Sequence, residues 1–242
     1  MGALCHRDYP APRGTTHPFL MLEFLTGGAY DKKTELYYTS NGDPCRVIGR
    51  ENRMKIGLIS DTHIPEAMPE LPAQIRDIFA GVDRILHAGD MHCLAVLDWL
   101  EEIAPVWAAR GNGDNGSGGR PVVPDDPRLQ EAQVITCAGW TVGVVHDVLD
   151  PEEMPQWPIE RTIQHYFGQQ TDIIVCGHTH VEGIWRYGEV WVINPGSPTF
   201  PHNLAAQPGT VGLLQLEPDG PAHVAIYDLK TLEPLPDLSV TL

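Results

Sequence analysis

The chain has 242 residues, of which 42% are hydrophobic, and this size and composition suffice for one large α/β domain with a buried core. No apolar run approaches the roughly 20 residues of a membrane-spanning helix, which argues against a membrane protein. Residues 1–53 hold seven Lys and Arg against six Asp and Glu, whereas residues 54–242 hold nine against 26, and this acidity opposes binding to the phosphates of nucleic acid.

Residues 1–53 differ in composition from the remainder of the chain. They contain clusters of Pro and Gly and show no sustained hydrophobic period. We therefore expect them to be a poorly ordered extension or a non-native segment that precedes the true start, and we place the folded domain at residues 54–242. The absence of a basic segment followed by an apolar one predicts a cytoplasmic protein, and the five widely spaced cysteines predict reduced thiols.

From Lys55 onward the hydrophobic pattern alternates between two periods. Short apolar runs predict strands at 55–60, 84–89 and 105–110, and apolar positions three and four apart predict helices at 71–81 and 93–102. This strand–helix–strand–helix–strand order is typical of a parallel sheet built by right-handed crossovers.

The second part of the domain has strands at closer spacing. Runs at 132–139 and 140–146 predict a hairpin that turns at Gly139 and Trp140; a helix is expected near 158–167 and a strand at 172–177. Alternating runs from 183 to 194 and from 210 to 229 predict antiparallel strands. The expected fold is therefore an α/β structure of two stacked mixed sheets flanked by helices.

Five of the expected strands end in polar residues. These clusters read DTH at 61, GD at 89, GNGD at 111, HD at 146 and GHTH at 177. Because the carboxyl ends of strands in α/β sheets converge on the ligand crevice, we expect these side chains to meet. The strand-end residues with metal-binding atoms are Asp61, His63, Asp90, Asn112, His146, His178 and His180.

Four imidazoles, two carboxylates and one amide oxygen suit a borderline divalent ion such as Mn, Fe, Zn or Ni. Calcium prefers oxygen ligands alone, and structural zinc sites normally use cysteines. A single His or Asp at a strand end is more often a hydrogen-bonding group than a ligand, but seven in one convergent layout favour a metal site. Seven ligands suffice for two ions about 4 Å apart if one carboxylate bridges them.

The ordered set of motifs resembles the calcineurin-like metallophosphoesterases, most closely their small YfcE-like phosphodiesterase branch. The match runs over residues 54–229 and includes one further motif, NPGS at 194. The resemblance implies a four-layer αββα sandwich of two mixed sheets flanked by helices. It also implies hydrolysis of phosphoester bonds by a hydroxide that bridges two divalent ions, which we expect to be manganese.

By this resemblance each candidate ligand has a role. The first ion would be bound by Asp61, His63 and His180, the second by Asn112, His146 and His178, and both by Asp90, which bridges them. The expected catalytic residues are Asp90, Asn112 and His178. Asn194, in the NPGS turn, would support the ligands from behind.

The function that follows is a metal-dependent phosphoesterase, and we favour hydrolysis of a small-molecule phosphodiester. Two alternatives stay open: a phosphomonoesterase, and a non-catalytic protein-interaction scaffold of the same fold, as in a eukaryotic coat protein of this superfamily. A nuclease is disfavoured by the acidity of residues 54–242. A homo-oligomer stays open as well.

One departure from the family's pattern concerns proton transfer. Many relatives place a His after the motif Asn, where it can protonate the leaving oxygen, but Gly113 occupies that position here. Leaving groups of low pKa are therefore favoured unless another group substitutes. His92 and His202 are the candidates, although packing is the simpler interpretation of both.

A second departure is Asp147, which stands where a glycine is expected after His146. Its carboxylate would either orient that imidazole or lie close to the second ion. For Asp114, in the glycine-rich stretch that follows Asn112, a hydrogen bond within the loop is the simplest interpretation.

Overall fold

The protein is described by a computed structural model that covers residues 53–242 in full and the backbone of residues 34–38 and 44–48. In these parts of the chain, no helix is both long and apolar enough to cross a membrane. The expected domain boundary at residue 53 and the expected character of residues 1–53 concern mostly residues outside this description, and they stay predictions.

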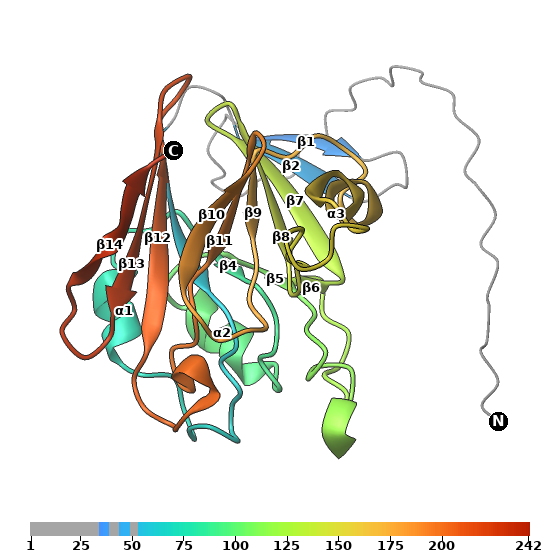
Figure 1. The fold of residues 1–242 in the computed structure, drawn as a ribbon. Coiled ribbons are helices and arrows are strands. Elements are labelled where there is room, and N and C mark those ends of the chain that lie inside the picture. The colour runs from blue at the N-terminus through green and yellow to red at the C-terminus, as the bar shows by residue number, and fades with distance from the viewer. Residues whose placement is uncertain (1–33, 39–43, 49–52) are drawn as a thin grey trace, which may run out of the picture. The chain divides into compact units, whose positions relative to one another are not determined.

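Two seven-stranded sheets form the centre of the fold (Figure 1). Sheet A contains β1 (Thr34–Tyr38), β2 (Pro44–Ile48), β7 (Ala132–Cys137), β8 (Trp140–Val145), β9 (Ile173–Val175), β10 (Gly183–Tyr187) and β11 (Val190–Asn194). Sheet B contains β3 (Met54–Ile59), β4 (Arg84–His87), β5 (Val106–Ala109), β6 (Leu129–Gln130), β12 (Thr210–Leu216), β13 (Ala222–Asp228) and β14 (Pro234–Thr241). The strand orders are β1-β2-β7-β8-β9-β11-β10 and β14-β13-β12-β3-β4-β5-β6.

Three α-helices and two short 3₁₀ turns accompany the sheets in the described residues. They are α1 (Gln74–Ile78), α2 (Ala95–Glu101), α3 (Ile159–Tyr166), η1 (Ser117–Gly119) and η2 (Pro201–Asn203). α1 is shorter than the expected span 71–81. Phe79 leaves the helical backbone region, and Pro72, which has no backbone N–H, precedes the first turn.

Sheet B begins with the parallel arrangement that the sequence predicts. β3 pairs with β4 and β4 with β5, all in parallel, with α1 and α2 in the crossovers. β12 then pairs antiparallel with β3 on the other side, which makes the sheet mixed. The edge strand β14 was not expected, because its sequence PLPDLSVT contains two prolines; prolines are tolerated at a sheet edge, where fewer N–H groups need a partner.

Sheet A contains the predicted hairpin, displaced by one residue. β7 and β8 pair antiparallel with Cys137 opposite Trp140, so the turn is formed by Ala138 and Gly139 and not by Gly139 and Trp140. Both turn residues have positive φ, 51° and 85°, as a two-residue turn with the right-handed twist of the strands requires. β9 lies parallel to both β8 and β11.

Alternation of side chains along the strands produces four layers. Leu58 of β3 and Val144 of β8 belong to one buried cluster between the sheets. The neighbouring Ile59 points to the opposite face of sheet B, where the cluster formed with α1 and α2 includes Phe79. α3 packs through Ile163 on the outer face of sheet A. The αββα sandwich expected from the sequence is confirmed.

Candidate metal centre

The strand-end residues singled out in the sequence come together at the carboxyl ends of five strands from both sheets. They follow β3 (Asp61 and His63), β4 (Asp90), β5 (Asn112), β8 (His146) and β9 (His178 and His180). Convergence of strand ends from two stacked sheets explains how residues 117 positions apart, such as Asp61 and His178, come into direct contact.

Three groups of carboxylate and imidazole ligand atoms lie within 4.8 Å of one another: Asp61 with His63 and His180, His63 with Asp90 and His92, and Asp61 with Asp90 and His146. The amide oxygen of Asn112 lies 3.1 Å from Nε2 of His146 and 3.0 Å from Nδ1 of His178. All seven candidate ligands therefore belong to one connected cluster, and His92 adjoins it.

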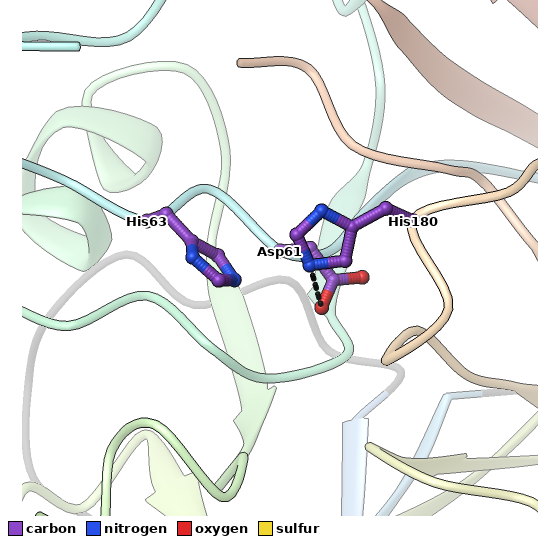
Figure 2. A group of neighbouring side chains, drawn as sticks. All are labelled: Asp61, His63 and His180. Atoms are coloured by element: carbon purple, nitrogen blue, oxygen red, sulfur yellow. Dashed lines mark ion pairs between the residues drawn. The ribbon is translucent and has the colours of Figure 1, made fainter. Parts of the chain in front are cut away.

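We call Asp61, His63 and His180 the first half of the centre (Figure 2). Nε2 of His180 lies 3.6 Å from Oδ1 of Asp61, and the His63 and His180 rings meet edge to face with their centroids 4.6 Å apart. Asp61 is fully buried and His180 is 3% exposed. Nε2 of His63 is buried and has no hydrogen-bond partner among the described residues, which is costly unless a cation or another group approaches it.

We call Asn112, His146 and His178 the second half. Here the side chains contact one another, because Nδ1 of His178 also lies 3.3 Å from Nε2 of His146. His146 is buried, whereas Asn112 and His178 are exposed to solvent. This half is open on one side, as a site that must admit a substrate requires.

Asp90 lies between the two halves and faces both. Its Oδ2 is 3.5 Å from Nε2 of His63, and its Oδ1 is 3.5 Å from Nε2 of His146. Both separations are at the outer limit of a hydrogen bond, so these contacts are chiefly electrostatic. The backbone N–H of Gly113 donates a hydrogen bond of 2.6 Å to Oδ1 and fixes the carboxylate in this orientation.

The two buried carboxylates have pKa values displaced in opposite directions. Burial, followed by repulsion from Asp90, holds the pKa of Asp61 well above its usual value. Burial also acts to raise the pKa of Asp90, but His63, His146 and the Gly113 amide outweigh it and hold that pKa well below its usual value. The two buried carboxylates offer oxygens within 4.8 Å of each other, and a cation beside both would offset their repulsion.

Burial keeps two imidazoles of the cluster, His146 and His180, neutral near pH 7. It lowers the pKa of His180 to about 4, and it also lowers the pKa of His146. A neutral imidazole retains a lone pair, which is the form that binds a metal ion.

Two imidazoles are oriented by backbone carbonyls on their far side. Nδ1 of His146 lies 2.8 Å from the Ala88 oxygen, and Nδ1 of His180 lies 2.8 Å from the Phe200 oxygen. With Nδ1 donating to a carbonyl, Nε2 presents its lone pair to the cluster, as metal-binding histidines do. Because Ala88 already orients His146, the structure assigns no such task to the neighbouring Asp147.

The backbone of the cluster is strained. Asp61, His63, Asp90, His178 and His180 all have positive φ, between 45° and 71°. For residues other than glycine this conformation costs about 1–3 kcal/mol each, and such strain gathers at functional sites. The fold tolerates it because hydrogen bonds from neighbouring loops fix each strand end.

The motif glycines create room for ligands from other motifs. A β-carbon at Gly177 would lie 2.6 Å from Oδ2 of Asp61, and one at Gly89 would lie 2.6 Å from Nδ1 of His146. Neither contact is sterically possible for a larger residue. The glycines in GD and GHTH thus allow loops from different strands to approach one another.

Side chains beyond the candidate ligands fix the loops. Asp114 is fully buried and accepts hydrogen bonds from the backbone N–H groups of Asp90, Met91, His92 and Gly111, so it acts within the loops as expected. The amide of Asn194 donates to the Gly177 oxygen and to the Thr179 hydroxyl, in agreement with a supporting role. The hydroxyls of Ser197 and Thr199 donate to the carbonyls of Asp61 and Thr62; sequence reasoning gave no role to these two.

The two candidate replacements for the missing acid differ in position. Nε2 of His202 lies 2.9 Å from Glu182, and the ring is partly exposed on η2. His92 is buried next to the first half, with its ring centroid 4.2 Å from that of His63.

The donor set fits divalent cations. Nitrogen and oxygen donors occur together, and burial holds His146 and His180 neutral. Asp61 and Asp90 offer buried oxygens within 4.8 Å of each other, and the buried Nε2 of His63 has no hydrogen-bond partner among the described residues. In a sandwich of two mixed sheets, this arrangement of donors at the strand ends is suited to bind divalent cations.

Comparison with known proteins identifies the family of the chain. The profile of the calcineurin-like phosphoesterase superfamily domain matches residues 54–219, and the chain belongs to this family. A probable metallophosphoesterase of Methanothermobacter thermautotrophicus is 35% identical over 150 residues, which cover 61% of this chain and 79% of that protein.

Two solved structures are similar in fold at lower identity. Vacuolar protein sorting 29 from Cryptosporidium parvum has a TM-score of 0.59 at 22% identity and covers 78% of this chain and 97% of its own. Wild-type Vps29 from Entamoeba histolytica, complexed with zinc, has a TM-score of 0.58 at 21% identity over 78% of this chain and 98% of its own. These two show a shared fold.

Proposed function

We propose that the protein hydrolyses a small-molecule phosphodiester with the aid of two divalent metal ions. The observation that carries this proposal is the position of Asp90, whose two oxygens face imidazoles of different halves. A carboxylate in this position is suited to bridge two ions. Manganese is our first choice, with iron, zinc and nickel as alternatives, because the donors mix nitrogen and oxygen.

Each half of the centre would hold one ion. Asp61, His63 and His180 would bind the first, Asn112, His146 and His178 the second, and Asp90 would bind both. Bound there, the ions would lower the pKa of a water molecule and neutralise charge on the phosphoryl oxygens.

Residues of the chain would set the spacing of the two ions and limit which substrates can enter. Asp90, fixed by the Gly113 amide, would set the spacing between the halves. Asn112 adds an oxygen donor without adding negative charge, and exposed His178 borders the open side where a phosphoester can enter. The acidity of residues 54–242 favours a small substrate over nucleic acid. Together these features support Asp90, Asn112 and His178 as catalytic residues.

A chromogenic phosphodiester tests the proposal. We expect metal-stripped protein to be inactive towards bis(p-nitrophenyl) phosphate and to regain activity when Mn²⁺ is added. Asp90→Asn should lower activity on the order of 10³-fold, because several kcal/mol of transition-state stabilisation depend on the ions. The matched control is Asp237→Asn, which changes an exposed carboxylate on β14 and should leave the rate unchanged.

The same assay separates the alternatives. Faster hydrolysis of p-nitrophenyl phosphate than of the diester would favour a phosphomonoesterase. Turnover by metal-stripped protein, or full activity of Asp90→Asn, would contradict the mechanism. Absence of turnover together with tight binding of a partner protein would favour a scaffold.

A further inference from the structure

His92 lies beside the first half and outside the seven candidate ligands. One of its ring nitrogens belongs to a group of three ligand atoms, with His63 and Asp90, that lie within 4.8 Å of one another. The imidazole is almost completely enclosed, with 2% of its side chain exposed. Among the described residues, its buried Nε2 has no hydrogen-bond partner, and the same holds for Nε2 of His63. Two buried nitrogens without hydrogen bonds near the same carboxylate are costly unless a cation approaches them.

The opposite edge of the His92 ring is held by a carboxylate. Nδ1 lies 2.8 Å from Oε2 of Glu66, and an ionised carboxylate only accepts hydrogen bonds, so Nδ1 is the donor in this contact. This leaves Nε2, on the side of His63 and Asp90, as the nitrogen that can bind a cation. His146 and His180 are oriented in the same way by carbonyl oxygens, and an acceptor behind the ring is the usual accompaniment of a metal-binding histidine.

The space for His92 depends on the residue at position 113. A β-carbon at Gly113 would overlap Nε2 of His92 and would lie 3.0 Å from Oδ1 of Asp90. Any residue larger than glycine would therefore displace the imidazole. The glycine that removes the expected acid after Asn112 is thus the residue that allows His92 to reach the centre.

We propose that His92 is an additional protein ligand at the first half, which binds a borderline divalent cation through Nε2 together with His63 and Asp90. This inference rests on the proposed metal centre and adds a protein donor to it. Glu66 acts as the residue that positions His92. A further nitrogen ligand favours ions that accept five or six ligands, such as Mn²⁺ or Fe²⁺, over four-coordinate Zn²⁺.

Metal binding by the full chain tests the proposal without reference to turnover. Metal-stripped protein is titrated with Mn²⁺ in a calorimeter, and the visible absorption of the Co²⁺-loaded protein reports the number of ligands. We expect His92→Ala to weaken the tighter Mn²⁺ site about 100-fold and to change the Co²⁺ spectrum, and Glu66→Ala to weaken it about 10-fold. The matched control is His223→Ala, which removes an exposed imidazole on β13 and should change neither.

A second pair of variants guards against a loss of fold. Gly113→Ala keeps the imidazole in the chain but displaces it, and it should weaken Mn²⁺ binding; in the His92→Ala background the same change should have a smaller effect, because the overlap is gone. Additive effects of the two changes would contradict the proposal. Circular dichroism of each metal-stripped variant identifies any that has unfolded.

The result for the parent protein separates this inference from the proposed function. If Asp90→Asn abolishes Mn²⁺ binding while His92→Ala leaves both affinity and Co²⁺ spectrum unchanged, the metal centre stands and the role of His92 is wrong. If the parent protein binds no divalent ion, both proposals are wrong.

Discussion

The two halves of the centre differ in burial and in what their donor atoms contact. In the first half, Asp61 is completely buried and Nε2 of His63 has no hydrogen-bond partner, whereas in the second half Asn112 is exposed and its oxygen contacts two imidazole nitrogens. A buried, unpartnered donor gains more from a cation than an exposed one that water can satisfy. If the proposed centre holds two ions, we therefore expect the first to bind tightly and the second to exchange more readily.

The largest expected effects are changes in metal content and activity when one histidine of either half is replaced. His180→Ala should lower the content of the tight ion and reduce phosphodiesterase activity by at least about 100-fold, because Asp61 stays buried with less compensation. His178→Ala should keep one ion per chain and lose the second, which is measured as metal per protein by mass spectrometry after dialysis. His165→Ala, an exposed histidine on α3, is the control. Retention of two ions by His180→Ala would invert our assignment of the tight half.

A smaller effect should appear in the dependence of stability on pH, through a histidine beneath the first half. His87 is buried; its Nδ1 accepts a hydrogen bond from the Gly89 N–H, and its Nε2 lies 3.2 Å from the Thr62 hydroxyl. Burial lowers the pKa of His87 to about 3, with the nearby His146 as the next cause. His87 thus stays neutral in the folded protein, while in the unfolded chain it binds a proton below about pH 6.5.

Between these pH values the unfolded state binds more protons, so the contribution of His87 to the free energy of unfolding falls as pH is lowered from about 6.5 towards 3. Urea denaturation of metal-stripped protein at pH 7 and pH 5 should show this loss. His87→Gln should be less stable at pH 7 and should lose less on acidification. Equal losses in both proteins would exclude His87 as a source of the acid sensitivity.

The smallest effect is expected in the second half, at Asp147. Because the Ala88 carbonyl already orients His146, Asp147→Gly should change kcat/KM by no more than about twofold. Initial rates with the chromogenic diester measure it. A large gain in activity would mean that this carboxylate competes with the substrate for the second half, and a large loss would give it the orienting role.

The order of strands and helices could be predicted from the sequence because it follows from the hydrophobic period of each segment and from the order of the segments in the chain. The parallel strands β3 to β5, the β7–β8 hairpin and the convergence of five strand ends follow from local patterns. β14 was missed because its prolines argue against a strand and edge pairing is a property of the sheet. The turn of the β7–β8 hairpin was predicted one residue too late. It includes Ala138, whose positive φ is unfavourable for a residue with a β-carbon and was therefore not expected.

The candidate site was predictable in its members and less so in its contacts. Strand-end position and residue type pointed to the seven side chains that form the cluster. The sequence around His92 does not distinguish it from a packing histidine. Glu66, which orients its ring, is 26 residues away in the chain and comes near it only in the folded structure. The roles of the individual ligands stay predictions until metal binding is measured.

The hydrogen bonds of Asp114 limit how two loops of the centre can move. One carboxylate accepts the N–H groups of Asp90, Met91 and His92 from one loop and of Gly111 from the next, so neither loop can open without breaking bonds to the same side chain. The four amide hydrogens should therefore exchange with solvent water at a common, slow rate, as one cooperative unit. The glycine-rich stretch beyond Asp114 lies outside this set of bonds, so its amide hydrogens should exchange faster than these four.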